Sequence, residues 1–113
     1  MKKDNLLYLH DIRDAIDWIL NDYVFKLSFD EFTGDHKTQD AVIRQIAIIG
    51  EALNSIDDEF LKKHQNLPSK EAVAMRNVLV HDYDSVDLDE LWKTINTDLP
   101  KLKSIIEDIL KTC

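Results

Sequence analysis

The sequence has few of the residues that interrupt or cross-link a chain. Among its 113 residues are two glycines, two prolines and one cysteine. That cysteine is Cys113, the last residue of the sequence, so it has no partner for an internal disulfide. With a hydrophobic content of 44%, this length and composition predict a single compact domain over residues 1–113, built on one core.

Long apolar runs are missing as well. No stretch reaches the length of about 18 apolar residues that a membrane span requires. Residues 1–18 carry charged side chains throughout, whereas a secretory signal contains a continuous apolar region. These two absences predict a cytoplasmic protein that does not contact a membrane.

Positive charge is scarce, because the formal net charge is −8. This value argues against proteins that coat nucleic acid through their overall charge, so RNA or DNA would have to bind at a local patch. Residues 62–70 contain three lysines and no acid, and they are either such a patch or an ordinary solvated linker. Only three arginines are present, Arg13, Arg44 and Arg76. Because lysine supplies most of the positive charge, an arginine can indicate a site that requires the planar guanidinium group and its paired N–H donors.

What the sequence does contain is helical periodicity. Apolar residues recur at intervals of three and four over residues 4–26, which predicts a long amphipathic helix with Asp4 or Asn5 as its N-cap. The recurring residues are Leu9, Ile12, Ile16, Ile19 and Tyr23. The polar stretch over residues 28–40, which contains Gly34, predicts a loop.

A second helix is expected to begin at Thr38 or Asp40. Its apolar residues are Val42, Ile46, Ile49, Leu53 and Ile56. Gly50 lies inside this helix, where glycine costs about 1 kcal/mol relative to alanine, so we expect it to let another helix approach closely. Residues 57–64 predict a short extra helix, and Pro68 suits the first turn of the helix that follows.

The last apolar stripe continues from Leu88 to Ile109 across Pro100. Asp87 and Glu90 have the spacing of a capping box and mark its start. Because the apolar spacing stays in register across the proline, the C-terminal helix is predicted to be kinked or in two pieces. Strand alternation is absent from the sequence, which therefore predicts an all-α fold: an antiparallel bundle of four main helices with one short extra helix.

Polar side chains interrupt the apolar pattern of the helix that follows Pro68, in the stretch MRNVLVHDY. One face of this helix is apolar and is expected to close the core; it contains Ala72, Met75, Val78 and Leu79. Val80 lies in a second direction. On a helical wheel Arg76 and Tyr83 flank Val80 on one side, and Asn77 and His81 flank it on the other.

A monomeric bundle buries only one stripe of each helix, so the second stripe around Val80 needs a partner. The simplest partner is the same helix of another subunit across a two-fold axis. A homodimer of this kind would place two copies of the flanking polar groups at the edge of one cleft between the chains.

Arg76, Asn77 and His81 form a candidate catalytic set for cleaving RNA without a metal. The arginine fork suits phosphate oxygens and a developing negative charge. His81 can give or take a proton near neutral pH, since an unperturbed histidine has a pKa of about 6.5. Asn77 can orient either the histidine or a ligand. One group would help the ribose 2′-hydroxyl attack phosphorus while an acid protonates the leaving oxygen.

Several non-catalytic interpretations stand beside this one. An arginine and a histidine five residues apart can simply pair with Asp82 or Asp84, and His81 with Asp82 could suggest metal ligands although no further ligand lies at a suitable spacing. The other histidines, His10, His36 and His64, stand alone and are expected at the surface or in loops. Trp18 and Trp92 are expected to fill the core or an interface.

The same residues resemble a known family. RNVLVHDY matches the Arg-x4-His-x-Tyr motif of the HepT-like toxins, a branch of the HEPN ribonuclease superfamily. The resemblance extends to AVIRQIAIIGEALNSI at residues 41–56 and to VDLDELWKTINTDLPKL at residues 86–102, so it covers nearly the whole chain. The chain departs from the family at Ala74, where a glycine is common, and lacks the tryptophan usual just upstream.

This resemblance implies a metal-independent ribonuclease toxin of a type VII toxin-antitoxin pair, with no cofactor and no DNA substrate. Arg76 and His81 match the catalytic pair, and Asn77 matches the polar residue beside the arginine. The family forms dimers through the motif helices. Its usual partner is an antitoxin of the minimal nucleotidyltransferase family, and Tyr83 matches the tyrosine that this partner adenylylates.

A binding module without catalytic activity is the alternative to an enzyme. In that case Arg76 would hold the phosphate of a nucleotide, or contact a nucleotidyltransferase partner, and His81 would only form hydrogen bonds. The acidic composition favours this module somewhat over a protein that binds RNA avidly.

Overall fold

A computed structural model describes residues 4–68, 70, 72 and 86–112 of the chain. The described residues form helices and no strand, which confirms the all-α fold. In chain order the elements are α1 (Asn5–Trp18), η1 (Ile19–Tyr23), α2 (Phe29–Thr33), α3 (His36–Ser55), α4 (Asp58–Lys63), α6 (Leu88–Lys93), η3 (Thr94–Asp98) and α7 (Leu99–Thr112). The elements η1 and η3 are π-helical.

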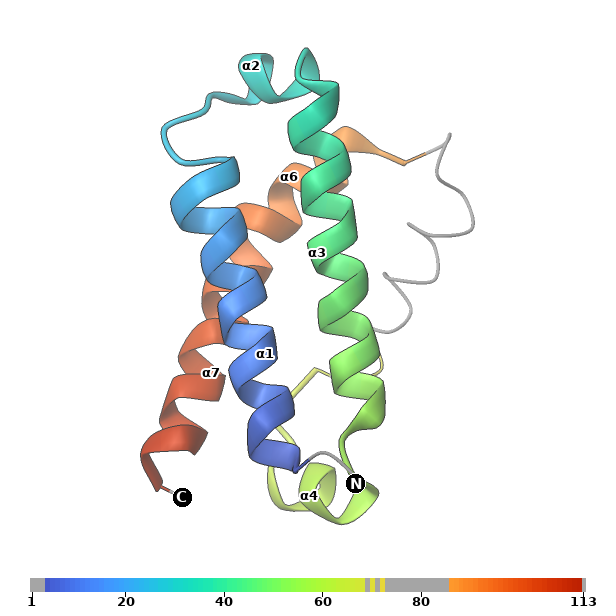
Figure 1. Ribbon diagram of the computed structural model, residues 1–113, viewed down its shortest axis with the longest axis vertical. Coiled ribbons are helices and arrows are strands. Elements are labelled where there is room, and N and C mark those ends of the chain that lie inside the picture. The colour runs from blue at the N-terminus through green and yellow to red at the C-terminus, as the bar shows by residue number, and fades with distance from the viewer. Residues whose placement is uncertain (1–3, 69, 71, 73–85, 113) are drawn as a thin grey trace.

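Three long helices share one apolar core. Helix α1 packs against both α3 and α7, and it runs opposite to them (Figure 1). Ile12 and Ile16 of α1, Leu53 of α3 and Ile106 of α7 have no exposed surface. The apolar stripes predicted from the sequence are therefore the buried ones. The fourth helix of the predicted antiparallel bundle lies mostly outside the described residues, so that arrangement stays a prediction.

Helix α1 begins as predicted and changes its geometry near its end. Asp4 is the N-cap, and its carboxylate accepts a hydrogen bond of 2.8 Å from the Leu6 N–H. After Trp18 the chain continues as η1, where the Val24 N–H donates to the Ile19 carbonyl at 3.0 Å. The chain then turns at Lys26, whose φ is 64°. Helical structure thus ends slightly before the predicted residue 26.

The loop predicted over residues 28–40 is wrong for most of its length. Ser28 and Glu31 form a reciprocal capping box, with hydrogen bonds of 3.1 and 3.0 Å, that starts the short helix α2. The bonds from Ser28 lower the pKa of the Glu31 carboxyl. Helix α3 begins at His36, earlier than predicted, because the Asp35 carboxylate caps it by accepting from the Thr38 N–H at 3.1 Å.

A buried side chain joins α2 to α3. The Gln39 side-chain amide donates to the backbone carbonyls of Phe32 and Thr33, at 2.8 and 3.1 Å. These carbonyls stand at the C-terminal end of α2, where the helix itself leaves carbonyls to be satisfied by other donors, and the Phe32 carbonyl also accepts from the Asp35 N–H at 3.2 Å. Gln39 is 9% exposed and Phe32 is fully buried, so the contact fixes α2 over the core.

The short extra helix is confirmed as α4, and hydrogen bonds connect its start to the beginning of the chain. The Asp57 N–H donates to Asn5 Oδ1 at 3.1 Å, and the Asn5 amide donates back to the Asp57 carboxylate at 3.3 Å. These residues lie at the N-terminal ends of α1 and α4. The turn into α4 is therefore held at the base of the bundle (Figure 1).

The interruption predicted at Pro100 takes the form of the π-helical stretch η3. The elements α6, η3 and α7 follow one another without a gap, and Figure 1 shows α6 inclined to α7. Pro100 is the second residue after η3, in the first turn of α7. Proline lacks an N–H and crowds the preceding turn, and the wider turn in which Leu99 N–H bonds to the Thr94 carbonyl accommodates it.

An ion pair connects α7 to α1. Lys103 Nζ lies 2.6 Å from Asp17 Oδ1 and 3.9 Å from Glu107 Oε1. The hydrogen bond with Asp17 raises the pKa of the Lys103 ammonium.

In the part of the chain that the structure describes, none of the helices has both the length and the apolar character of a membrane span.

Replacing Gln39 with leucine tests how α2 is held. The substitution keeps the volume but leaves the Phe32 and Thr33 carbonyls without their side-chain donor, and it should lower the free energy of unfolding by about 1–3 kcal/mol. Urea denaturation followed by circular dichroism measures the change. Gln45→Leu, a half-buried position on the same helix, is the matched control. Equal effects of both substitutions would contradict the role assigned to Gln39.

Candidate functional site

The predicted catalytic residues Arg76, Asn77 and His81 and the predicted modification site Tyr83 lie outside the described residues. The same holds for Val80, on which the dimer prediction depends. The structure does describe both ends of the segment that carries them and the helices beside those ends. These surroundings define where the chain enters and leaves the candidate site.

The upstream end of the segment is a tight turn followed by a helical start. The Leu67 N–H donates to the His64 carbonyl at 3.0 Å, and Leu67 itself is buried. The Ala72 N–H donates to the Pro68 carbonyl at 3.1 Å, and Lys70 and Ala72 are helical. The prediction that a helix starts near Pro68 is therefore confirmed for its first turn.

The downstream end is fixed by a cap. Val86 is partly buried against the core. The Asp87 carboxylate then accepts hydrogen bonds from the Asp89 and Glu90 N–H groups, at 2.9 and 3.3 Å, and so caps α6 as predicted. Since Ala72 also packs against the core, both ends of the motif segment are attached to the same cluster of apolar side chains.

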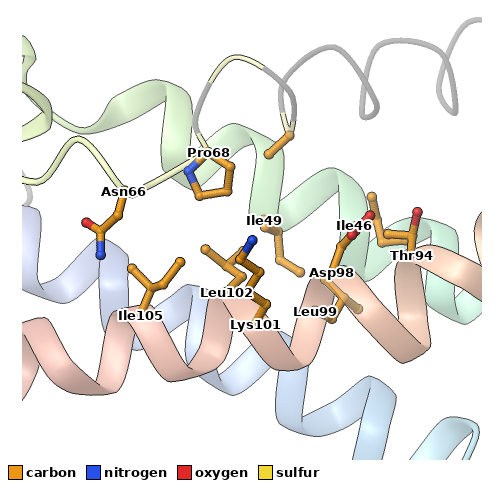
Figure 2. Close-up of a pocket in the computed structure, with 11 residues that line it drawn as sticks. Ile46, Ile49, Asn66, Pro68, Thr94, Asp98, Leu99, Lys101, Leu102 and Ile105 are labelled. Carbon is orange, nitrogen blue, oxygen red and sulfur yellow. The ribbon is translucent and has the colours of Figure 1, made fainter.

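A pocket with a volume of about 310 Å³ lies between α3 and α7, beside the upstream end. We call it the α3–α7 pocket (Figure 2). Its apolar lining comprises Ile46, Ile49, Pro68, Ala72, Leu99, Leu102 and Ile105, and its polar lining comprises Asn66, Thr94, Asp98 and Lys101. Ala72, the first residue of the apolar face predicted for the motif helix, is thus placed at this pocket.

The polar residues of the α3–α7 pocket differ in what they can contribute. The Thr94 hydroxyl donates to the Glu90 carbonyl at 3.0 Å and is buried, so it is already engaged. Asn66, Asp98 and Lys101 are exposed at the surface. The sequence pattern did not single out Asp98 and Lys101 as parts of a site, because they lie on the polar side of a helix, where charged residues are expected in any case.

Other sequence candidates are placed away from any chemical cluster. The His64 ring contacts the Phe60 ring in a tilted arrangement, with centroids 4.5 Å apart, and His36 is exposed at the start of α3. His10 is half-buried on α1. Within residues 4–68, 70, 72 and 86–112, no three histidine, cysteine or acidic side chains gather closely enough to hold a metal ion.

The two tryptophans have different environments. Trp92 is half-buried and contacts Phe32 and Phe29, with ring centroids 5.0 and 5.9 Å apart, as expected for a residue at the edge of the core. Trp18 is 54% exposed and stacks on Tyr23. A place in the core is therefore wrong for Trp18, and a place in an interface stays a prediction.

Comparison with known proteins addresses the whole chain. A sequence model of the family described as "Ribonuclease HepT-like" matches residues 12–109. A protein of Thermococcus cleftensis named "Probable ribonuclease HepT" is 40% identical over 111 residues, which cover 98% of this chain and all of the relative.

Two more relatives carry the name "Putative RNase". The one from Methanocaldococcus jannaschii is 36% identical over 94% of this chain and 96% of the relative. The one from Caldanaerobacter subterraneus is 34% identical over 92% of each chain. No solved structure matches the chain. The family match over residues 12–109 includes the motif segment and both of its described ends. From this match and the identity with these relatives, the chain belongs to the ribonuclease HepT-like family.

Proposed function

We propose that this chain is a metal-independent endoribonuclease that acts as the toxin of a toxin-antitoxin pair. The observation that carries the proposal is the match to the ribonuclease HepT-like family over residues 12–109, a range that includes Arg76, Asn77, His81 and Tyr83. The family and its relatives named as ribonucleases support RNA as the substrate.

In the proposed reaction the ribose 2′-oxygen attacks the adjacent phosphorus, and the bond from phosphorus to the 5′-oxygen of the next nucleotide breaks. A base removes the 2′-hydroxyl proton and an acid delivers a proton to the leaving oxygen. The products are a 2′,3′-cyclic phosphate and a 5′-hydroxyl. Arg76 stabilises the charge on the phosphoryl oxygens, His81 is an acid or base, and Asn77 orients one of the reacting groups.

A homodimer would complete this site. The second apolar stripe around Val80 is best buried against the same helix of another subunit, which brings a second Arg76 and a second His81 to the cleft. One histidine could then act as the base while the other acts as the acid. Neutral and protonated histidines coexist near neutral pH, since the unperturbed pKa is about 6.5.

Tyr83 is the proposed point of control. It lies seven residues after Arg76, two turns along a continuing helix, so an adenylyl group on its hydroxyl would bring a phosphate near the guanidinium. That phosphate would compete with the RNA phosphate for the arginine, and the nucleotide would occupy the cleft. An antitoxin of the nucleotidyltransferase class could thereby inactivate the enzyme by modifying one residue.

Removal of the catalytic side chains is the direct test of activity. Arg76→Ala should lower kcat by about 10²- to 10³-fold, and His81→Ala by about 10²- to 10⁴-fold. Cleavage of a fluorescent RNA by wild type should continue in EDTA, and Arg44→Ala, which removes an exposed arginine of α3, should leave the rate unchanged. Activity that disappears in EDTA and returns with a divalent ion would overturn the mechanism. RNA binding without cleavage would support the binding module instead.

Introducing a charge at Val80 tests the shared cleft. Val80→Asp should weaken self-association because an unpaired carboxylate would have to be buried at the contact, and cleavage should fall with it. Sedimentation velocity at micromolar concentration measures the assembly. Ile48→Asp, at a position of α3 that is 36% exposed, is the matched control and should remain dimeric. A monomeric wild type with full activity contradicts the model.

Co-expression with the nucleotidyltransferase partner tests the control by Tyr83. Intact-protein and peptide mass spectrometry should find adenylyl groups on Tyr83 in the wild type, and Tyr83→Phe should carry none there and remain active. Tyr23→Phe removes the hydroxyl of a tyrosine whose ring stacks on Trp18, and it should leave the modification of Tyr83 unchanged. An inactive complex in which Tyr83 is unmodified would instead indicate that the partner blocks the cleft physically.

A further inference from the structure

We infer that Lys62, Lys63, Lys70 and Lys101 form a surface that binds phosphates of the RNA substrate on the approach to the motif segment. We call these four residues the lysine surface. The inference rests on the proposed ribonuclease function and adds to it the part of the chain that holds the RNA backbone outside the reacting nucleotides.

Three of the lysines belong to a part of the chain that is fixed to the core. Lys62 and Lys63 end helix α4, and both are exposed. The following turn is anchored by Leu67, which is 6% exposed, and by the contact between the His64 and Phe60 rings. Residues 62–68 are therefore not a loose linker. A fixed backbone matters because only the lysine side chains then have to be ordered on binding.

Lys70 lies in the first turn of the motif helix. It is exposed, and the hydrogen bond from the Ala72 N–H to the Pro68 carbonyl spans it. Arg76 follows six residues later. The lysine surface is thus continuous in the sequence with the proposed catalytic residues.

Lys101 joins this surface from a different element. It is exposed on α7 and lines the α3–α7 pocket together with Asn66 and Pro68 of the turn. Figure 2 shows its side chain pointing from α7 toward this turn. Lys101, far along the chain, therefore lies at the same pocket as Asn66 and Pro68, which stand between Lys63 and Lys70 in the sequence.

The charges of these lysines are not neutralised within the described part of the chain. Lys103, in contrast, is paired with Asp17 and Glu107, and Lys26 lies over the Phe25 ring. No ion pair of the described residues involves any member of the lysine surface. Among the described residues that line the α3–α7 pocket, Asp98 is the one acid and Lys101 the one base, so the pocket lining carries no excess charge. The positive charge comes from the exposed Lys62, Lys63 and Lys70 of the adjoining segment.

The chemistry of lysine indicates the type of contact. Its ammonium is a strongly hydrated point charge on a flexible stem, which suits phosphate contacts that do not depend on base sequence. Each such contact releases condensed cations from the nucleic acid, so the logarithm of the affinity for a single strand falls by about 0.7 per contact for each tenfold rise in salt. The lysine surface thus predicts a measurable salt dependence.

The test uses a fluorescent single-stranded RNA in which every 2′-hydroxyl is methylated, so that no internal attack can cleave it. Fluorescence anisotropy over a range of salt concentrations gives the affinity and its salt slope. Lys62→Ala, Lys63→Ala, Lys70→Ala and Lys101→Ala should each weaken binding about threefold or more at low salt and reduce the slope by about 0.7. Lys101→Arg should retain wild-type binding, and Lys37→Ala, at an exposed lysine of α3, is the matched control.

Cleavage of unmodified RNA separates this inference from the proposed function. In the lysine variants KM should rise while kcat stays near the wild-type value, because these residues do not touch the reacting atoms. If wild type binds the methylated RNA through these lysines but cleaves no RNA, the lysine surface stands and the ribonuclease proposal fails. Unchanged affinity and slope in the four variants overturn the lysine surface, whatever the activity. Loss of assembly with the antitoxin, with RNA binding intact, would assign these lysines to an acidic protein surface and would also overturn it.

Discussion

Burial of the apolar stripes of α1, α3 and α7 in one shared core is the interaction on which the rest of the structure depends. Ile16, Leu53 and Ile106, one from each helix, are fully buried. Each such side chain contributes about 1.5–3 kcal/mol relative to exposure, whereas a cap or a single hydrogen bond contributes about 1 kcal/mol. Ala72 and Val86 pack on the same cluster. The core therefore determines where the motif segment begins and ends.

Elements that rest on apolar periodicity could be predicted from the sequence, and elements that rest on hydrogen bonds between polar side chains could not. The buried stripes of α1, α3 and α7 agree with the predicted ones because periodicity reports burial directly. Helix α2 was missed because its start depends on the reciprocal bonds of Ser28 and Glu31, inside a stretch whose polar composition is typical of loops. The early start of α3 depends in the same way on Asp35.

The π-helical stretches show a second limit of periodicity. A residue inserted into a helical turn shifts the face of every residue after it, yet the apolar spacing across Pro100 had suggested an undisturbed register. In η3 Thr94 and Ile95 are both buried, so two successive side chains face the core where the turn widens. A pattern of threes and fours tolerates this shift, because the next apolar residue, Leu99, is again at an interval of four from Ile95. The proline was visible in the sequence, but the wider turn before it was not.

The candidate site combines information of two kinds. Arg76, Asn77 and His81 were found because their side chains suit phosphate and proton transfer, and because their motif resembles that of a ribonuclease family to which the chain belongs. Lys101 could not be found in this way. It lies far along the chain from residues 62–70, and only the packing of α7 beside the turn brings it to the same pocket.

An acidic chain that binds RNA has to separate its charges in space, and the fold provides a way to do so. At physiological salt the Debye length is about 8 Å, so carboxylates on distant helices have little effect at the lysine surface, while lysines within that range reinforce one another. The net charge of −8 still opposes binding of nucleic acid over the rest of the surface. Under the proposed function, RNA would be held where the lysines and Arg76 engage its phosphates. The acidic composition, which at first argues against a nucleic-acid enzyme, would thereby restrict RNA binding to these positions.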